Sequence, residues 1–176
     1  MRNSWFKDLL LVVDCWTSPA LTDGQHELSA LINVALNCER RHGARIIHIN
    51  TGRPITEQID TDQDESYTHL GSMEFIKNNV TFSDHERFFL LGFHYNSCMV
   101  QMYYDMCALG VPSDSIGLVL NLTLPYTNTE APYNPWVLVN PWPQLDLPPI
   151  PHYLWSEQGF DRIDINSHAR NLTPTQ

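Results

Sequence analysis

The hydrophobic positions of this chain alternate between short continuous runs and longer stretches with helical spacing. Residues 8–14 contain the run "LLLVV", which is typical of a strand buried on both faces in a parallel sheet. Apolar residues then recur at helical spacing over 22–43, and "ARIIHIN" at 44–50 indicates a second buried strand. A strand, a helix and a strand in this order predict a right-handed crossover between parallel strands.

Polar residues and a glycine predict where the first helix begins and ends. Thr22, followed three positions later by Gln25, fits a capping box at the N-terminus of the helix. Gly43 fits the C-terminal cap, where a residue with left-handed backbone is common. We therefore expect the helix to lie between Thr22 and Gly43.

The alternation continues after a polar interruption. Two more strands and a helix are predicted, at 86–94 ("ERFFLLGFH"), 115–123 ("SIGLVLNLT") and 98–109. The segment 51–81 before them is polar and acidic, and we expect it to pass over the carboxyl edge of the sheet. Its acidic part, Asp60 to Ser66, lacks the glycine and the distal glutamate of an EF-hand loop, so it is interpreted as a solvated surface loop.

The C-terminal part has a different composition, since nine of the twelve prolines lie between Pro125 and Pro174. Proline without an internal repeat favours extended or irregular backbone. We therefore predict an α/β core at 1–123, with a mostly parallel sheet flanked by helices in three layers, and a proline-rich C-terminal extension at 124–176. Within the extension, "WVLVN" at 136–140 is interpreted as one further strand. The aromatic residues of the extension favour packing on the core or on a partner subunit.

Composition and charge indicate which kinds of molecule this protein is not expected to bind. The chain has 20 acidic and 10 basic residues, and its net charge of -10 disfavours nucleic acid and anionic membranes. Its apolar runs are shorter than the roughly 18 residues needed to cross a bilayer, so no membrane insertion is expected. The N-terminal region lacks the features of a signal peptide, and the four cysteines show no CxxC spacing. Both observations favour free thiols and a cytoplasmic protein.

Two chemically active residue types follow predicted strands. Asp14 ends the first strand, and Cys98 follows the third strand at the start of a helix. The carboxyl ends of parallel strands share one edge, where functional groups of open α/β sheets gather. A helix N-terminus favours the thiolate form of a cysteine, and the thiolate is a nucleophile. The other three cysteines lie in apolar strand or helix patterns and are interpreted as inert packing residues: Cys15, Cys38 and Cys107.

The segment around Cys98 resembles the nucleophile segment of the isochorismatase-like cysteine hydrolases, a superfamily that includes nicotinamidases and carbamoylases. That segment has a glycine six positions before the cysteine, an aspartate seven after it and a glycine twelve after it. Gly92, Asp105 and Gly110 match at these offsets. The stretch "LLLVVDCW" is also similar to the first strand of the family, which ends in the general base. The resemblance covers residues 8–123.

The resemblance implies roles for Asp14, for Cys98 and for the residues just before Cys98. Asp14 would be the general base and Cys98 the nucleophile, and the backbone amides of Ser97 and Cys98 would bind the oxyanion. His94 and Tyr95 would lie beside the substrate. The substrate would enter at the carboxyl edge of the sheet.

The family also uses a lysine that supports the charge of the reacting groups, and this role would fall to Lys77. The chain has only two lysines, and Lys7 lies at the other end of the first strand. Relatives place a helix between this lysine and the third strand, whereas "NNVTFSDHE" is too short for one. The interpretation of Lys77 as an ordinary surface lysine therefore stays open, as does support of the thiolate by Arg53 or His94.

No metal and no cofactor are expected. Nicotinamidases of the family carry a metal site built on an aspartate and histidines after the second strand, but "HINTGRPITEQID" lacks that arrangement. His48, inside the second predicted strand, is interpreted as a core residue with a hydrogen-bond partner and not as a metal ligand.

Two functions of different classes remain open. The first is a hydrolase that cuts a small-molecule amide, carbamoyl or vinyl ether substrate through Cys98. The second is a protein with the same fold but no activity, serving as a structural or assembly subunit. The short segment after Lys77, the bulky Tyr95 and the proline-rich extension support the second. Through that extension we expect a homo-oligomer or an assembly partner.

Overall fold

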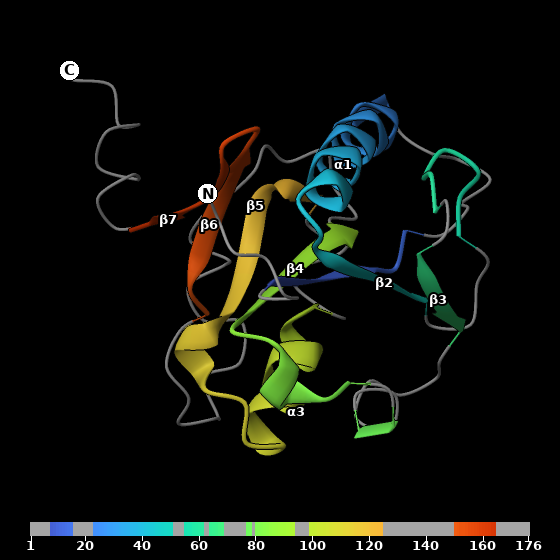
Figure 1. The fold of residues 1–176 in the computed structure, drawn as a ribbon. Coiled ribbons are helices and arrows are strands. Elements are labelled where there is room, and N and C mark those ends of the chain that lie inside the picture. Colours follow the sequence, from blue (N-terminus) through green and yellow to red (C-terminus); the bar gives the residue numbers. More distant parts are fainter. Residues whose placement is uncertain are drawn as a thin grey trace.

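The computed structural model describes residues 8–15, 23–50, 55–61, 64–68, 77–78, 80–93, 99–124 and 150–164. Within them, one sheet contains seven strands (Figure 1). The strands are β1 (Asp8–Val13), β2 (Arg45–Asn50), β3 (Glu65–Thr68), β4 (Arg87–Phe93), β5 (Ile116–Leu124), β6 (His152–Ser156) and β7 (Gly159–Ile163). The helices are α1 (Asp23–Arg41), α3 (Val100–Ala108) and the short 3-10 helices Phe82–Asp84 and Ser113–Ser115.

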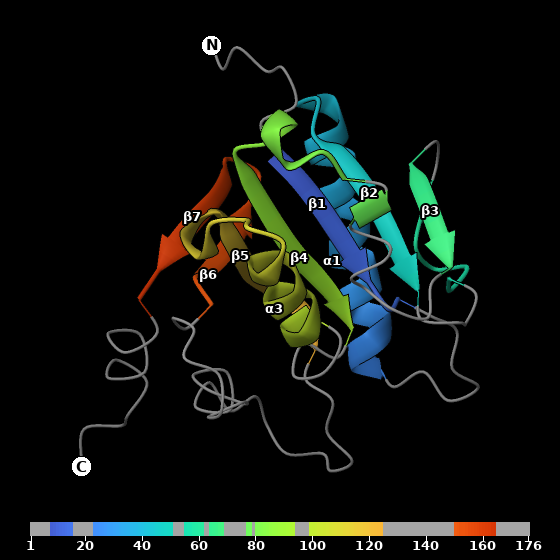
Figure 2. The same ribbon diagram turned by 90° about the horizontal axis from the view of Figure 1, so that it is seen from below.

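The sheet is mostly parallel. Its strand order is β3-β2-β1-β4-β5-β6-β7, and only β6 and β7 pair in the antiparallel sense. Helix α1 lies on one face of the sheet and α3 lies on the other (Figures 1 and 2). This confirms the predicted three-layer α/β architecture, with β1 in the middle of the parallel part.

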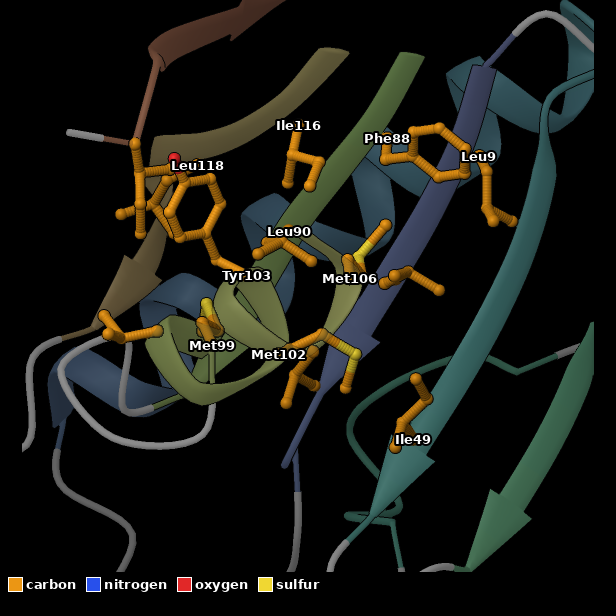
Figure 3. Packing of buried hydrophobic residues seen from close by; sticks show 14 of the residues in the cluster. Leu9, Ile49, Phe88, Leu90, Met99, Met102, Tyr103, Met106, Ile116 and Leu118 are labelled. Carbon is orange, nitrogen blue, oxygen red and sulfur yellow. The ribbon is translucent and has the colours of Figure 1, made fainter. Parts of the chain in front are cut away.

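Both faces of the sheet are covered, which explains why the strands read as continuous apolar runs. Alternate residues of β1 belong to opposite hydrophobic clusters: Leu9, Leu11 and Val13 to the cluster with α3, Leu10 and Val12 to the cluster with α1. Figure 3 shows the α3 side, where Met102, Tyr103 and Met106 pack with residues of the strands. Each fully buried side chain of this size contributes about 1.5–3 kcal/mol to folding.

Helix α1 agrees with the prediction from its caps. It begins at Asp23, next to Thr22, which lies outside the described residues. At its end Gly43 has a φ of 78°. The Gly43 N–H donates to the carbonyl of Arg40 at 3.0 Å, and the Ala44 N–H donates to that of Glu39 at 3.1 Å. This pair of hydrogen bonds defines a Schellman motif, for which glycine is the preferred residue.

The acidic segment was predicted to be a solvated loop, but hydrogen bonds and ion pairs attach the residues before β3 to the rest of the protein. Asp64 accepts a hydrogen bond from His48 Nε2 at 2.8 Å, and the guanidinium of Arg40 binds the same carboxylate with Nε at 3.0 Å from Oδ1. Arg40 also donates to the carbonyl of Asp60 at 2.7 Å. His48 is 1% exposed, so the expectation of a hydrogen-bonded core histidine is confirmed. Part of the acidic segment is therefore attached to α1 and β2.

The C-terminal extension contributes two strands that the hydrophobic pattern did not indicate. β6 pairs in parallel with β5, and the antiparallel partner β7 follows it after two residues. Tyr153, Trp155 and Phe160 are buried in the cluster on the α1 side. Residues 150–164 thus extend the same sheet as the core. The predicted strand at 136–140 lies outside the described residues.

Among the described residues, no helix has both the length and the apolar character that a membrane span requires.

Candidate active site

Asp14 directly follows β1 at the carboxyl edge of the sheet. β1 pairs with β2 on one side and β4 on the other, so Asp14 lies next to the ends of both strands. Its backbone N–H donates to the carbonyl of Ile49 at 2.8 Å, and the residue is 1% exposed. A buried carboxyl group therefore occupies the edge where the sequence places the general base.

The backbone of Asp14 is left-handed, with a φ of 54°, and no other described residue besides glycine has a positive φ. For a residue with a side chain this conformation costs about 1–2 kcal/mol, although aspartate adopts it more readily than most. Such conformations persist where the surrounding structure imposes them, and they cluster at functional sites. The conformation of Asp14 therefore favours a functional role for this residue.

Gly92 allows β4 to approach the end of β1. In the register of the two strands Gly92 lies opposite Val13, and its φ is 119°. A Cβ atom at this position would lie 2.2 Å from the Val13 carbonyl oxygen and 3.1 Å from the sulfur of Cys15. Only glycine fits this position without moving the backbone of β1. The first glycine of the family-like motif thus has a packing role beside Asp14.

The predicted residues around the nucleophile lie outside the described part of the chain. β4 ends at Phe93, and the structure resumes at Met99, which is fully buried. The residues between them are His94, Tyr95, Asn96, Ser97 and Cys98. The topology brings the end of β4 beside the end of β1, so the segment that contains Cys98 starts next to Asp14 along the sheet. The roles of these residues stay predictions.

Helix α3 follows this segment. Its first turn contains no acidic residue, and its N-cap residue Met99 makes no side-chain capping hydrogen bond. The positive end of the helix dipole is therefore not offset by a carboxylate of that turn. Asp105, matched to the family motif, accepts a hydrogen bond from Gln101 at 2.8 Å on the same helix. Gly110 follows the helix end, where its N–H donates to the carbonyl of Cys107 at 3.0 Å.

Lys77 lies in a helical pair with Asn78, and its side chain is exposed. An ammonium group that supports a buried carboxylate and thiolate would be expected to be largely covered. Its assignment as the family's lysine therefore stays a prediction. Arg53, the alternative cation, lies outside the described residues together with His94.

Two of the other thiols are poor candidates for a nucleophile. Burial raises the pKa of Cys15 far above its ordinary value, and the neighbouring Asp14 raises it further, so that thiol stays protonated. Burial also raises the pKa of Cys107. Neither cysteine is therefore expected to form a thiolate near neutral pH. This agrees with their interpretation as packing residues.

Sequence reasoning missed one residue that lies beside the carboxyl end of β1. Thr56 is 3% exposed, and its backbone N–H donates to the carbonyl of Cys15 at 2.8 Å. The loop after β2 thus returns to the end of β1 and covers it. Loops of this kind show no hydrophobic period, so nothing in the pattern of residues 55–61 indicates this contact.

The structure resembles solved structures of isochorismatase-like proteins, whereas comparison of the sequence with protein-family models and with curated proteins finds no match. N-carbamoylsarcosine amidase from Thermoplasma acidophilum is 13% identical with a TM-score of 0.54, over 74% of this chain and 88% of that one. An isochorismatase-like hydrolase from Alkaliphilus metalliredigens is 12% identical with a TM-score of 0.54, over 69% and 84%. The MAR1 ribonuclease of Caenorhabditis elegans is 12% identical with a TM-score of 0.53, over 67% and 65%.

At identities this low, the similarity establishes a common architecture. It does not establish a common activity. The similarity does agree with the resemblance noted around Asp14 and Cys98. This chain therefore has the isochorismatase-like fold.

Proposed function

We propose that this protein is a cysteine hydrolase that acts on a small-molecule amide, carbamoyl or vinyl ether substrate, with Cys98 as nucleophile and Asp14 as general base. The observation that carries the proposal is the buried, left-handed Asp14 at the carboxyl end of a central parallel strand. A buried residue with a left-handed backbone at the carboxyl edge of an α/β sheet is typical of a functional site. The assignment of Cys98 as the nucleophile rests on the resemblance of its segment to the nucleophile segment of the family.

In the first half of an amide reaction, the Asp14 carboxylate accepts the proton of the Cys98 thiol. The thiolate then attacks the carbonyl carbon, a C–S bond forms, and the carbonyl electron pair moves onto oxygen. The backbone N–H groups of Ser97 and Cys98 would stabilise this oxyanion. When the C=O bond re-forms, the C–N bond breaks, and the leaving nitrogen takes the proton from Asp14.

In the second half, water hydrolyses the thioester. Asp14 accepts a proton from the water, whose oxygen attacks the thioester carbon. The C–S bond breaks, and Asp14 returns the proton to the Cys98 sulfur. Lys77 would support the negative charge only if its side chain turned toward the edge. No step of this cycle requires a metal or a cofactor.

A substrate screen with matched variants tests the proposal. Against a panel of amides and carbamoyl compounds, we expect Cys98→Ala to abolish turnover and Asp14→Asn to lower kcat/KM by about 100-fold or more. Cys107→Ser and Asp105→Asn are the controls, and they should retain most of the activity. Turnover that survives in Cys98→Ala would refute the assignment of the nucleophile.

A second candidate function is favoured by the exposure of Lys77. It is an inactive form of the fold that serves as a structural subunit, forming a homo-oligomer or binding an assembly partner through the C-terminal extension. Mass spectrometry after iodoacetamide treatment of the same proteins separates the two functions. A reactive site requires iodoacetamide to label Cys98 much faster than the other three cysteines. The labelling rate of Cys98 should also fall in Asp14→Asn. Equally slow labelling of all four would favour the structural subunit.

A further inference from the structure

Three side chains with metal-binding atoms meet at the C-terminal end of α1. They are Cys38, Glu39 and His42, and their ligand atoms all lie within 4.8 Å of one another. The Cys38 sulfur is 3.9 Å from Nδ1 of His42, one helical turn further on. Residues four positions apart lie on the same side of a helix, so this pairing follows from their spacing. Thiolate, imidazole and carboxylate are the three side-chain ligands that zinc uses in proteins.

The cluster is separate from the edge that holds Asp14. Helix α1 ends at Arg41 and leads into the start of β2, whose first residue, Arg45, pairs with Leu9 near the beginning of β1. Asp14 follows the other end of β1. A ligand bound at the cluster would therefore not take part in the reaction proposed above.

Neighbouring groups hold the three ligands in place. Trp155 Nε1 donates to Oε1 of Glu39 at 3.0 Å, and the zinc ion would bind the other carboxylate oxygen. The Cys38 thiol donates to the carbonyl of Glu157 at 3.8 Å, and a bound zinc ion would take the place of that thiol proton. The Schellman motif fixes the backbone after His42. Hydrogen bonds to ligating side chains are a regular feature of metal sites, because they orient the ligands.

Charge and access also suit a divalent cation. Cys38 is 5% and Glu39 is 2% exposed, so a thiolate and a carboxylate side by side there would need a nearby positive charge. A zinc ion would neutralise both, and the C-terminal end of a helix favours a cation. His42 is exposed, so the ion has a path from solvent. Of the two arginines next to the cluster in the sequence, Arg40 is already engaged with Asp64.

We propose that Cys38, Glu39 and His42 form a zinc site at the end of α1, beside the β6–β7 hairpin, with solvent as the fourth ligand. Ligand atoms around a tetrahedral zinc lie about 3.5 Å apart, so the observed spacing closes by a movement of about 1 Å. The expectation of no metal was based on other positions, namely the segment after the second strand and His48 within that strand. The zinc site does not depend on the hydrolase proposal.

Metal binding tests this site directly. The full chain carrying Cys98→Ala is used, so that the proposed nucleophile cannot bind the metal. After dialysis against zinc, we expect one equivalent of bound zinc, an increase in Tm, and a thiolate-to-metal charge-transfer band when cobalt replaces zinc. Adding His42→Gln should lower the zinc affinity at least about tenfold and remove the Tm increase.

Control variants separate this site from other histidines and thiols. His42 is exposed, so His42→Gln should fold normally; Cys38→Ser removes the sulfur and with it the charge-transfer band. His26→Gln, an exposed histidine at the other end of α1, should bind zinc as the parent does. Absence of stoichiometric binding by the parent would overturn the proposal. Equal binding by the His42 and His26 variants would also overturn it.

Discussion

The missing side chain of Gly92 is what lets the ends of β1 and β4 meet. Replacing Gly92 by alanine would place a Cβ atom 2.2 Å from the Val13 carbonyl oxygen, in a backbone with a φ of 119°. Strain and overpacking together are expected to lower the free energy of unfolding by about 3 kcal/mol or more. Urea unfolding followed by circular dichroism measures the change.

Gly110→Ala provides the matched comparison. Gly110 also has a positive φ, of 92°, but nothing lies within 4 Å of the position that its Cβ would occupy. Only the left-handed backbone is then penalised, by about 1 kcal/mol. Similar losses for both alanine variants would mean that contact with β1 does not explain why glycine is required at position 92.

His152 is a buried titratable residue on β6. Burial lowers its pKa to about 4, and its Nε2 atom has no hydrogen-bond partner among the described residues. The imidazole is therefore neutral in the folded protein, whereas an unfolded histidine binds a proton below about pH 6.5. The contribution of His152 to the free energy of unfolding is then fully present above pH 6.5. It declines as the pH falls from 6.5 toward 4.

A variant isolates this contribution from other titrating groups. Between pH 7 and pH 4.5, the unfolding free energy of the parent should fall by about 2 kcal/mol more than that of His152→Gln. Chemical unfolding at a series of pH values gives the difference. Parallel curves for the two proteins would show that His152 does not resist protonation in the folded state.

The position of Asp14 could be predicted from the sequence, but its conformation could not. The apolar run of β1 ends at Val13, so the next polar residue had to lie at the carboxyl edge. The left-handed backbone depends on the hydrogen bond to Ile49 of β2 and on the approach of β4. Those contacts join segments that are far apart in the sequence, so no local pattern indicates them.

At the level of elements, helices and strands with a strong hydrophobic period agree with prediction, and short polar ones were missed. β1, α1, β2, β4, α3 and β5 lie where the apolar pattern predicts them. β3 has the sequence Glu-Ser-Tyr-Thr and shows no apolar run. Of the described strands it pairs only with β2, and Arg45 on β2 binds Glu65 with distances of 2.6 and 2.9 Å. Tertiary contacts, and not local preference, make this segment a strand.

The attachment of the acidic segment to α1 should contribute to stability. Burial raises the pKa of Asp64, but hydrogen bonds from His48 and Arg40 outweigh this effect and hold the pKa below its usual range. Asp64→Asn removes the charge that pairs with a largely buried guanidinium. We expect it to lower the free energy of unfolding by about 3 kcal/mol, measured by urea unfolding.

Glu65→Gln is the control for an exposed ion pair. The side chains of Arg45 and Glu65 are 24% and 37% exposed, compared with 16% and 9% for Arg40 and Asp64. Solvent screens the more exposed pair, so its loss should cost about 0.5 kcal/mol. If Asp64→Asn were as mild as Glu65→Gln, the acidic segment would behave as the solvated loop first predicted.

At the level of the whole molecule, the parallel α/β architecture could be predicted from the sequence. The two strands that extend the sheet beyond β5, namely β6 and β7, could not. β6 contains a histidine and a serine among aromatic residues, and prolines at 148, 149 and 151 precede it. These residues favoured an irregular segment. The strand forms because β5 would otherwise be an edge, and because Tyr153 and Trp155 cover the α1 side of the sheet.

The contact between Trp155 and Glu39 joins residues 116 positions apart, and this has a consequence for biosynthesis. Until the ribosome has made residues 150–164, one flank of α1 and the edge of β5 that pairs with β6 have no cover. A truncated product would expose that apolar surface and would be a target for chaperones and proteases. The sheet is therefore complete only after residues 150–164 have been translated.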